Sequence, residues 1–168
     1  STLEGIVETP ELGAVRVYSV HLGHAAAAER RIQISTLNRI LRETPSQGGV
    51  VTGRKASSHW TADGPLVDMP WRAIFLGDFN LTPMDPEYEL LTGALDPKYG
   101  RISRLDGLID AWHAVDNDPT RGLTCGSDNG MVRIDYAFIT MDLVDQVTRM
   151  WVDETAKGSD HQPIFVEF

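Results

Sequence analysis

The sequence predicts a domain of mixed α and β structure (fold class α+β), and three stretches carry this prediction. Residues 73–76 form a continuous apolar run that ends in glycine, a carboxylate and a carboxamide, as in a strand covered on both faces. Residues 131–139 alternate in polarity around Asp135, which indicates a second strand. Residues 25–42 contain good helix formers with an apolar stripe, so they predict a helix that covers a sheet.

The remaining elements are shorter. Residues 3–7 and 14–22 flank a turn-like segment and predict a β-hairpin. Residues 84–91 predict a short helix with Pro86 near its first turn, where proline is tolerated. The alternating residues 164–168 predict a final strand.

Residues 44–70 are predicted to be a long flexible loop, because they are rich in Gly, Ser and Thr and have no sustained periodicity. Gly48 and Gly53 have the spacing of a phosphate-binding loop. However, Arg54 and Lys55 follow where that motif requires lysine and then serine or threonine. The loop is therefore not interpreted as a nucleotide site.

The bulk composition is that of one globular domain. The chain has 168 residues, 42% of them hydrophobic and 23% charged, with a net charge of −9. This charge disfavours a protein held on nucleic acid mainly by counterion release. Cys125 is the single cysteine, which excludes an internal disulfide and a multi-cysteine metal site.

Neither a secretory signal nor a transmembrane segment is visible in the sequence. Together with the cysteine content, this favours a cytoplasmic location, although the sequence does not determine the compartment. The chain begins at Ser1 rather than at a methionine. A removed leader or a missing upstream region therefore stays open.

Polar side chains gather at the ends of the predicted strands. Carboxylates are ligands for Mg²⁺ or Mn²⁺, an amide can hold a phosphoryl oxygen, and an imidazole beside a carboxylate can transfer protons. No zinc-type spacing is present. The residues that combine these properties are His21, Asp78, Asn80, Asp135, Asp160 and His161.

Three of these residues also have simpler interpretations. Asp135 would be a structural acid if it formed an ion pair with Arg133, two positions earlier in the same strand. Asp78 would be a turn-forming acid. His21 would be a structural histidine with a satisfied hydrogen bond.

Four segments in this order resemble the endonuclease/exonuclease/phosphatase superfamily. The histidine at position 21 is more similar to the deoxyribonuclease and sphingomyelinase branches than to the abasic-site endonucleases. The segments cover nearly the whole chain. They are Tyr-Ser-Val-His-Leu at 18–22, Leu-Gly-Asp-Phe-Asn at 76–80, Arg-Ile-Asp-Tyr at 133–136 and Gly-Ser-Asp-His-Gln-Pro at 158–163.

The resemblance implies a four-layer α/β/β/α sandwich of two packed mixed sheets with outer helices, and Mg²⁺-dependent hydrolysis of a phosphate ester by a phosphodiesterase, nuclease or phosphatase. It makes His161 the catalytic histidine, paired with Asp135, and Asp160 a metal-linked acid. Asp78 and Asn80 would position phosphate and water and are further candidates for metal contact. His21 would contact phosphate or donate a proton.

One departure limits the resemblance. Family members carry a metal-site asparagine and a metal-binding glutamate before the equivalent of His21, whereas only 20 residues precede it here. We therefore expect residues 1–168 to be the C-terminal two-thirds of one domain, incomplete at the N-terminus. Such a portion would expose apolar sheet surface and associate with another copy or with the missing segment.

Two functions follow as alternatives. The first is a hydrolase whose substrate is a small phosphate ester, a lipid headgroup or a nucleic acid, with the acidic charge favouring the first two. The second is a non-catalytic phosphate-binding module, or an inactive fragment that needs the upstream metal ligands.

Overall fold

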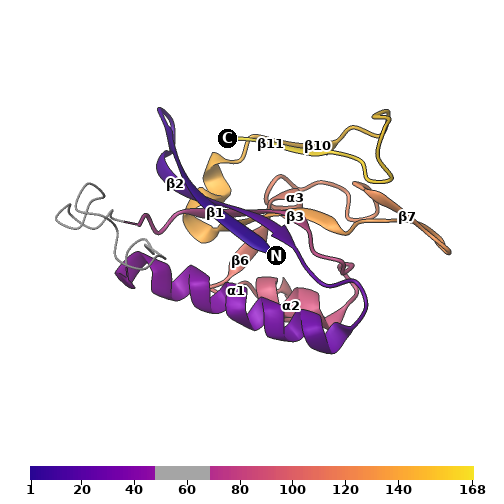
Figure 1. Cartoon of the computed structure of the whole chain (residues 1–168), viewed down its shortest axis with the longest axis horizontal. Coiled ribbons are helices and arrows are strands. Elements are labelled where there is room, and N and C mark those ends of the chain that lie inside the picture. Colours follow the sequence, from indigo (N-terminus) through magenta and orange to yellow (C-terminus); the bar gives the residue numbers. More distant parts are fainter. Residues whose placement is uncertain (48–68) are drawn as a thin grey trace, which may run out of the picture.

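The computed structural model describes residues 1–47 and 69–168, and its centre is a five-stranded mixed sheet (Figure 1). The strand order is β1 (Thr2–Thr9), β2 (Gly13–His21), β3 (Ala73–Asp78), β9 (Asp135–Thr140) and β6 (Leu108–Asp110). Only the β2–β3 pair is parallel, and helix α1 lies between these strands in the sequence. The predicted hairpin is therefore β1–β2, and the predicted buried strand is β3.

Helices α1 (Ala27–Gln47) and α2 (Pro86–Thr92) cover one face of the sheet (Figure 1). Both helices bury apolar side chains against aromatic residues of β3 and β9, and this burial is the main stabilising contribution on that face. Pro86 lies at the start of α2, as predicted. The fully buried residues of this core include Ile34, Leu41, Phe75, Phe79, Tyr88, Leu91 and Phe138.

The opposite face is covered by α3 (Ala111–Ala114), the 3₁₀ helix η1 (Met141–Gln146) and a two-stranded antiparallel sheet, β10 (Arg149–Val152) with β11 (Ile164–Glu167). Met150, Ile164 and Val166 pack in a second core with residues of the large sheet. Figure 1 shows the layers from one side of the molecule to the other: helices α1 and α2, the large sheet, and the β10–β11 pair. The predicted α+β class is confirmed, and the layering is consistent with a sandwich.

Residues 131–139 form two strands rather than the single predicted strand. β8 (Gly130–Val132) pairs with β7 (Cys125–Ser127), and β9 begins only at Asp135. Another small pair is β4 (Leu95–Asp96) with β5 (Gly100–Arg101). None of the helices in the described part of the chain is long and apolar enough to cross a membrane.

The predicted loop over 44–70 is wrong at its first residues, because α1 continues through Pro45 to Gln47. A proline has no N–H to bond the carbonyl four residues earlier, here that of Leu41. The buried guanidinium of Arg16 donates to this Leu41 carbonyl at 3.1 Å instead. Residues 48–68 of the predicted loop lie outside the described residues.

Candidate active site

Strand register brings three predicted site residues to one end of the large sheet. His21, the last residue of β2, is paired with Asp78, the last residue of β3. Asp78 is in turn paired with Asp135, the first residue of β9. Because β3 is parallel to β2 and antiparallel to β9, the C-terminal ends of β2 and β3 lie beside the N-terminal end of β9.

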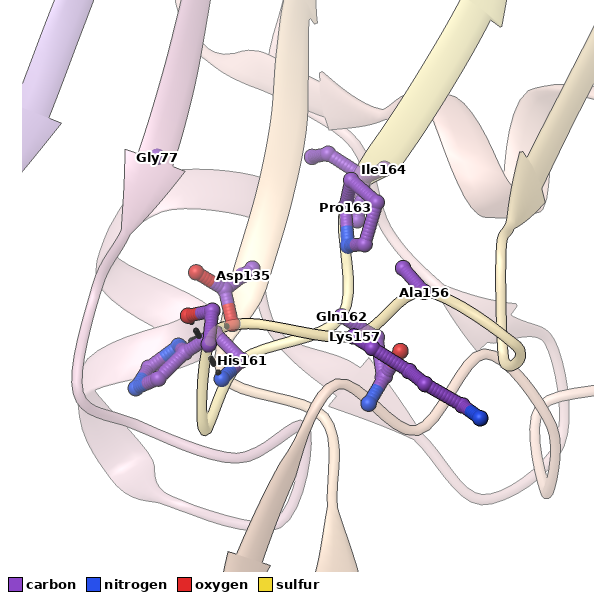
Figure 2. Close-up of a pocket in the computed structure, with 9 residues that line it drawn as sticks. Gly77, Asp135, Ala156, Lys157, His161, Gln162, Pro163 and Ile164 are labelled. Atoms are coloured by element: carbon purple, nitrogen blue, oxygen red, sulfur yellow. Dashed lines mark hydrogen bonds and ion pairs between the residues drawn. The ribbon is translucent and has the colours of Figure 1, made fainter.

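His161 joins this group from the segment before β11. Its Nδ1 lies 2.9 Å from Oδ2 of Asp135 (Figure 2). Since a carboxylate only accepts hydrogen bonds, the Nδ1–H donates and Nε2 is left for other partners. The alternative ion pair between Asp135 and Arg133 is wrong, because Arg133 is buried and pairs with Asp110 at 2.6 Å.

Asp78 and Asn80 form a second bonded pair. Asp78 accepts the backbone N–H of Asn80 at 2.8 Å and the Asn80 side-chain Nδ2 at 3.0 Å. The same Nδ2 donates to the carbonyl of Leu22 at 2.9 Å. Asn80 has a φ of 50°, so the two side chains meet through a left-handed turn and not through the extended backbone that the sequence suggested.

The last two predicted residues lie at the margin of the group. His21 has a side chain that is 65% exposed, and its Nε2 lies 3.6 Å from Oδ2 of Asp78. Asp160 is exposed and precedes His161 in the chain. Asp160 influences the site through its charge, which contributes to the raised pKa of His161.

The electrostatic environment of His161 favours its charged form. Partial burial by itself lowers the pKa of the imidazole, but the hydrogen bond and negative charge of Asp135 outweigh it, with further contributions from Asp78 and Asp160. The net pKa of His161 is therefore raised above its usual value. At the neighbouring Cys125, burial followed by the same carboxylates raises the pKa of the thiol.

A cavity of about 380 Å³ opens beside the Asp135–His161 pair (Figure 2). Lys157 and Gln162 also line it, and the sequence interpretation assigned no role to either. The available signal was the motif at 158–163, which contains Gln162 and directly follows Lys157. A larger cavity of about 800 Å³ is lined by other residues, including Tyr88 and His113, and by none of the predicted site residues.

The acids of the site do not make a metal centre by themselves. Within residues 1–47 and 69–168, no group of three or more His, Cys, Asp or Glu side chains is arranged to hold a metal ion. Asp78 and Asp160 are the carboxylates predicted for metal contact. Further ligands would be needed to complete a site around them.

The four sequence motifs and the layered α+β fold point to the same class of protein. The sequence profile of the Endonuclease/Exonuclease/phosphatase family matches residues 5–161, and the chain belongs to this family. No curated protein matches the chain.

Several solved structures have the same fold. A mannosyl-6-phosphatase from Bacteroides thetaiotaomicron has a TM-score of 0.60 at 17% identity, over 99% of this chain and 55% of that one. The catalytic domain of APE2 from Xenopus laevis has a TM-score of 0.56 at 19% identity, over 99% and 54%. A Neisseria 3′ phosphatase, NExo, bound to a product DNA hairpin has a TM-score of 0.55 at 17% identity, over 99% and 70%. The chain thus spans little more than half the length of the first two.

Proposed function

We propose that the full-length protein hydrolyses phosphate esters by in-line attack of water on phosphorus. The observation that carries the proposal is the Asp135–His161 pair, 2.9 Å apart, beside the bonded Asp78–Asn80 pair. An imidazole oriented by a buried or half-buried carboxylate is a suitable general base for activating water. Family membership supports phosphate-ester chemistry as the reaction class.

In this proposal, Asp135 fixes the tautomer of His161 and leaves Nε2 to receive the water proton. Asp135 also stabilises the imidazolium that forms, because its charge lies within hydrogen-bond distance. The alternative role is that an imidazolium already present stabilises the charged phosphoryl group. The two roles require opposite protonation states of His161, so the pH dependence of the rate separates them.

The role of Asn80 is revised by its hydrogen bonds. We expected its amide to donate to a non-bridging phosphate oxygen, but Nδ2 already donates to Leu22 and Asp78. The atom that remains is the carbonyl Oδ1, which accepts hydrogen bonds. Asn80 is therefore proposed to orient the attacking water, and the exposed His21 is proposed to contact the phosphoryl group or protonate the leaving oxygen.

We propose Mg²⁺ or Mn²⁺ as the cofactor, with Asp160 and Asp78 as carboxylate contacts. The Oδ1 of Asn80 would be a third oxygen if it contacts the ion instead of the attacking water. A divalent ion would offset negative charge on the phosphate. The described residues alone do not form a complete site for it. The remaining ligands, which the resemblance implies are an asparagine and a glutamate, would come from elsewhere in the full-length protein.

The same observation supports the second candidate, a phosphate-binding module without catalytic activity. Mg²⁺ titration of this chain followed by calorimetry discriminates between the two when it is compared with the full-length protein. Binding by the full-length protein but not by residues 1–168 supports the enzyme with shared ligands. Absence of binding by both at millimolar Mg²⁺ supports the binding module.

The substrate is proposed to be a small phosphate ester or a lipid headgroup, since the net charge of −9 opposes a long anionic polymer. The relatives do not decide this, because one is a mannosyl-6-phosphatase and another is bound to DNA. Turnover on sphingomyelin, inositol phosphates, bis(p-nitrophenyl) phosphate and plasmid DNA would rank the classes. Preferred cleavage of plasmid DNA would contradict the proposal.

Exposed apolar residues support a further proposal, that another chain segment or a second copy covers them. Leu3 and Val7 of β1 are 74% and 45% exposed, and Phe165 of β11 is 43% exposed. Phe165 stacks on Trp151, with ring centroids 5.0 Å apart. Sedimentation of residues 1–168 and of the full-length protein tests this: a monomeric full-length protein supports the covering segment, and a dimeric one supports the second copy.

A cytoplasmic location stays a prediction that cell fractionation tests.

The test of the catalytic proposal is His161→Ala in the full-length protein. Loss of the base should reduce the turnover number about 10²–10⁴-fold. His113→Gln is the matched control, because His113 lines the other cavity. Wild-type turnover by the His161 variant across the substrate panel would refute the assignment.

A further inference from the structure

Thr124 is a buried residue that contacts both chain segments of the Asp135–His161 pair. Its side chain has no solvent exposure, and it lies immediately before β7, outside all the segments that resemble family motifs. Its Oγ1 accepts the backbone N–H groups of Ile134 and Asp135, each at 3.2 Å. A single hydroxyl oxygen therefore anchors the first residue of β9, which carries the catalytic carboxylate of the proposed reaction.

The backbone of Thr124 holds the histidine segment. Its carbonyl accepts the N–H of Gln162 at 2.7 Å, and the next residue, Cys125, forms an isolated antiparallel bridge with His161. Its own N–H donates to the carbonyl of Val132 at 2.8 Å. The backbone of Thr124 is thus hydrogen-bonded both to the strand that precedes Asp135 and to the segment that carries His161.

The anchoring occurs where regular pairing stops. Arg133 and Ile134 separate β8 from β9, so the Ile134 N–H has the Thr124 hydroxyl as its acceptor in place of a neighbouring strand. Both N–H groups are part-buried, and an N–H shielded from water without an acceptor costs free energy, so the hydroxyl favours this backbone position. The consequence is a defined position for the Asp135 side chain, on which the 2.9 Å contact with His161 depends.

We infer that Thr124 is a positioning residue for the hydrolytic reaction, which aligns the Asp135 carboxylate with His161 through its hydroxyl. The inference deepens the proposed function and rests on it. A displacement of about 1 Å in a catalytic group can cost about 10²-fold in rate. The effect is expected in the turnover number, because Thr124 is buried and is not among the residues that line the cavity beside the pair.

The test compares Thr124→Val, which keeps the shape and removes the hydroxyl, with Thr124→Ser, which keeps the hydroxyl. Thr140→Val is the matched control. Thr140 is equally buried at the other end of β9, and its Oγ1 accepts the N–H of Ala73 at 3.1 Å. The full-length proteins are assayed for kcat and KM on bis(p-nitrophenyl) phosphate, and thermal unfolding shows how much stability each has lost.

We expect Thr124→Val to lower kcat about 10²-fold with little change in KM. Thr124→Ser should restore kcat, and Thr140→Val should keep it while losing similar stability. If Thr124→Val keeps wild-type kcat, or if Thr124→Ser is as defective as Thr124→Val, the inference is overturned. The serine result matters because it separates the hydroxyl from packing of the methyl group.

Hydrogen exchange judges the inference independently of activity. The amides of Ile134 and Asp135 should exchange faster in Thr124→Val than in the wild type and Thr124→Ser, together with loss of the His161 Nδ1–H resonance. Unchanged exchange and an unchanged resonance in the valine variant would overturn the positioning role. If the wild-type protein cleaves no ester in the panel, the proposed function fails. The exchange measurement still tests whether the Thr124 hydroxyl positions Asp135 against His161.

Discussion

The Nδ1 atom of His161 lies 2.9 Å from Oδ2 of Asp135, although 26 positions separate the two residues in the chain. An amide in place of the carboxylate would keep the shape and remove the charge. We expect Asp135→Asn to lower the turnover number about 10²–10⁴-fold with the fold retained, because the imidazole loses both its orientation and its charge partner. Steady-state kinetics and circular dichroism check this. Asp142→Asn, at a surface ion pair with Arg72, should leave turnover unchanged.

The raised pKa of His161 predicts a pH dependence. If neutral His161 accepts the water proton, kcat/KM should fall on the acid side with a midpoint above the usual histidine value of 6.5. Asp135→Asn should move this midpoint down, since the carboxylate is what raises the pKa. An NMR titration of the His161 ring gives the same midpoint directly. A rate that falls on the alkaline side instead would support the imidazolium role.

The raised pKa of His161 also makes the stability of the folded protein depend on pH. A histidine whose folded pKa exceeds its unfolded value stabilises the folded state most below pH 6.5, and this contribution is lost as the pH rises through the folded pKa. Chemical denaturation between pH 5 and 9, compared with His161→Gln, checks the sign. A wild-type advantage that grows with pH would contradict it.

Asn80→Asp should be destabilising despite its small change in shape. The new carboxylate cannot donate to Leu22, and it would place negative charge beside Asp78, where Nδ2 now lies 3.0 Å away. We expect a loss of about 1–3 kcal/mol in the free energy of unfolding, measured by urea denaturation. Asn38→Asp is the control, because Asn38 is half-buried like Asn80 and its Nδ2 donates to the carbonyl of Leu90, away from the site. Equal losses at both positions would show that the like charge at the site has no effect.

Arg16 should stabilise the end of α1 in a way that depends on Pro45. Arg16→Met would leave the carbonyls of Leu41 and Trp71 without their donor, so we expect a loss of about 2 kcal/mol or more. Adding Pro45→Ala supplies an N–H for Leu41 and should recover part of this loss. Urea denaturation of the single and double variants measures the coupling. Strictly additive effects would show that Arg16 does not substitute for the missing N–H.

Gly77 should not tolerate a side chain. It has a φ of 133°, and a Cβ would lie 2.1 Å from the carbonyl oxygen of Val20 on the neighbouring strand. Gly77→Ala should therefore lower the melting temperature sharply or prevent folding, because the clash is with backbone in the middle of a sheet. Gly5→Ala is the control, with no atom within 4 Å of the new methyl group. A stable, folded Gly77→Ala protein would refute this.

Much of the fold was predictable because local patterns decide it. Apolar continuity identified β3, the turn between two β segments identified the β1–β2 hairpin, and a proline identified the start of α2. The predictions failed where a distant residue replaced a local partner. Helix α1 continues past Pro45, where Arg16 bonds the Leu41 carbonyl, and the strand expected at 131–139 is interrupted where Arg133 turns inward to Asp110.

The sequence by itself determined which residue types the candidate site contains and that they lie at or beside strand ends, since both depend on composition and short spacing. The roles of His21, Asp78, Asn80, Asp135, Asp160 and His161 stay predictions. Only the tertiary structure decided which of them touch. His21, Asp78 and Asp135 meet because of strand order and register, and Asn80 reaches Asp78 through a left-handed turn. Thr124 had no sequence signal, because its contacts with Asp135 and Gln162 exist only when long-range packing brings their backbones together.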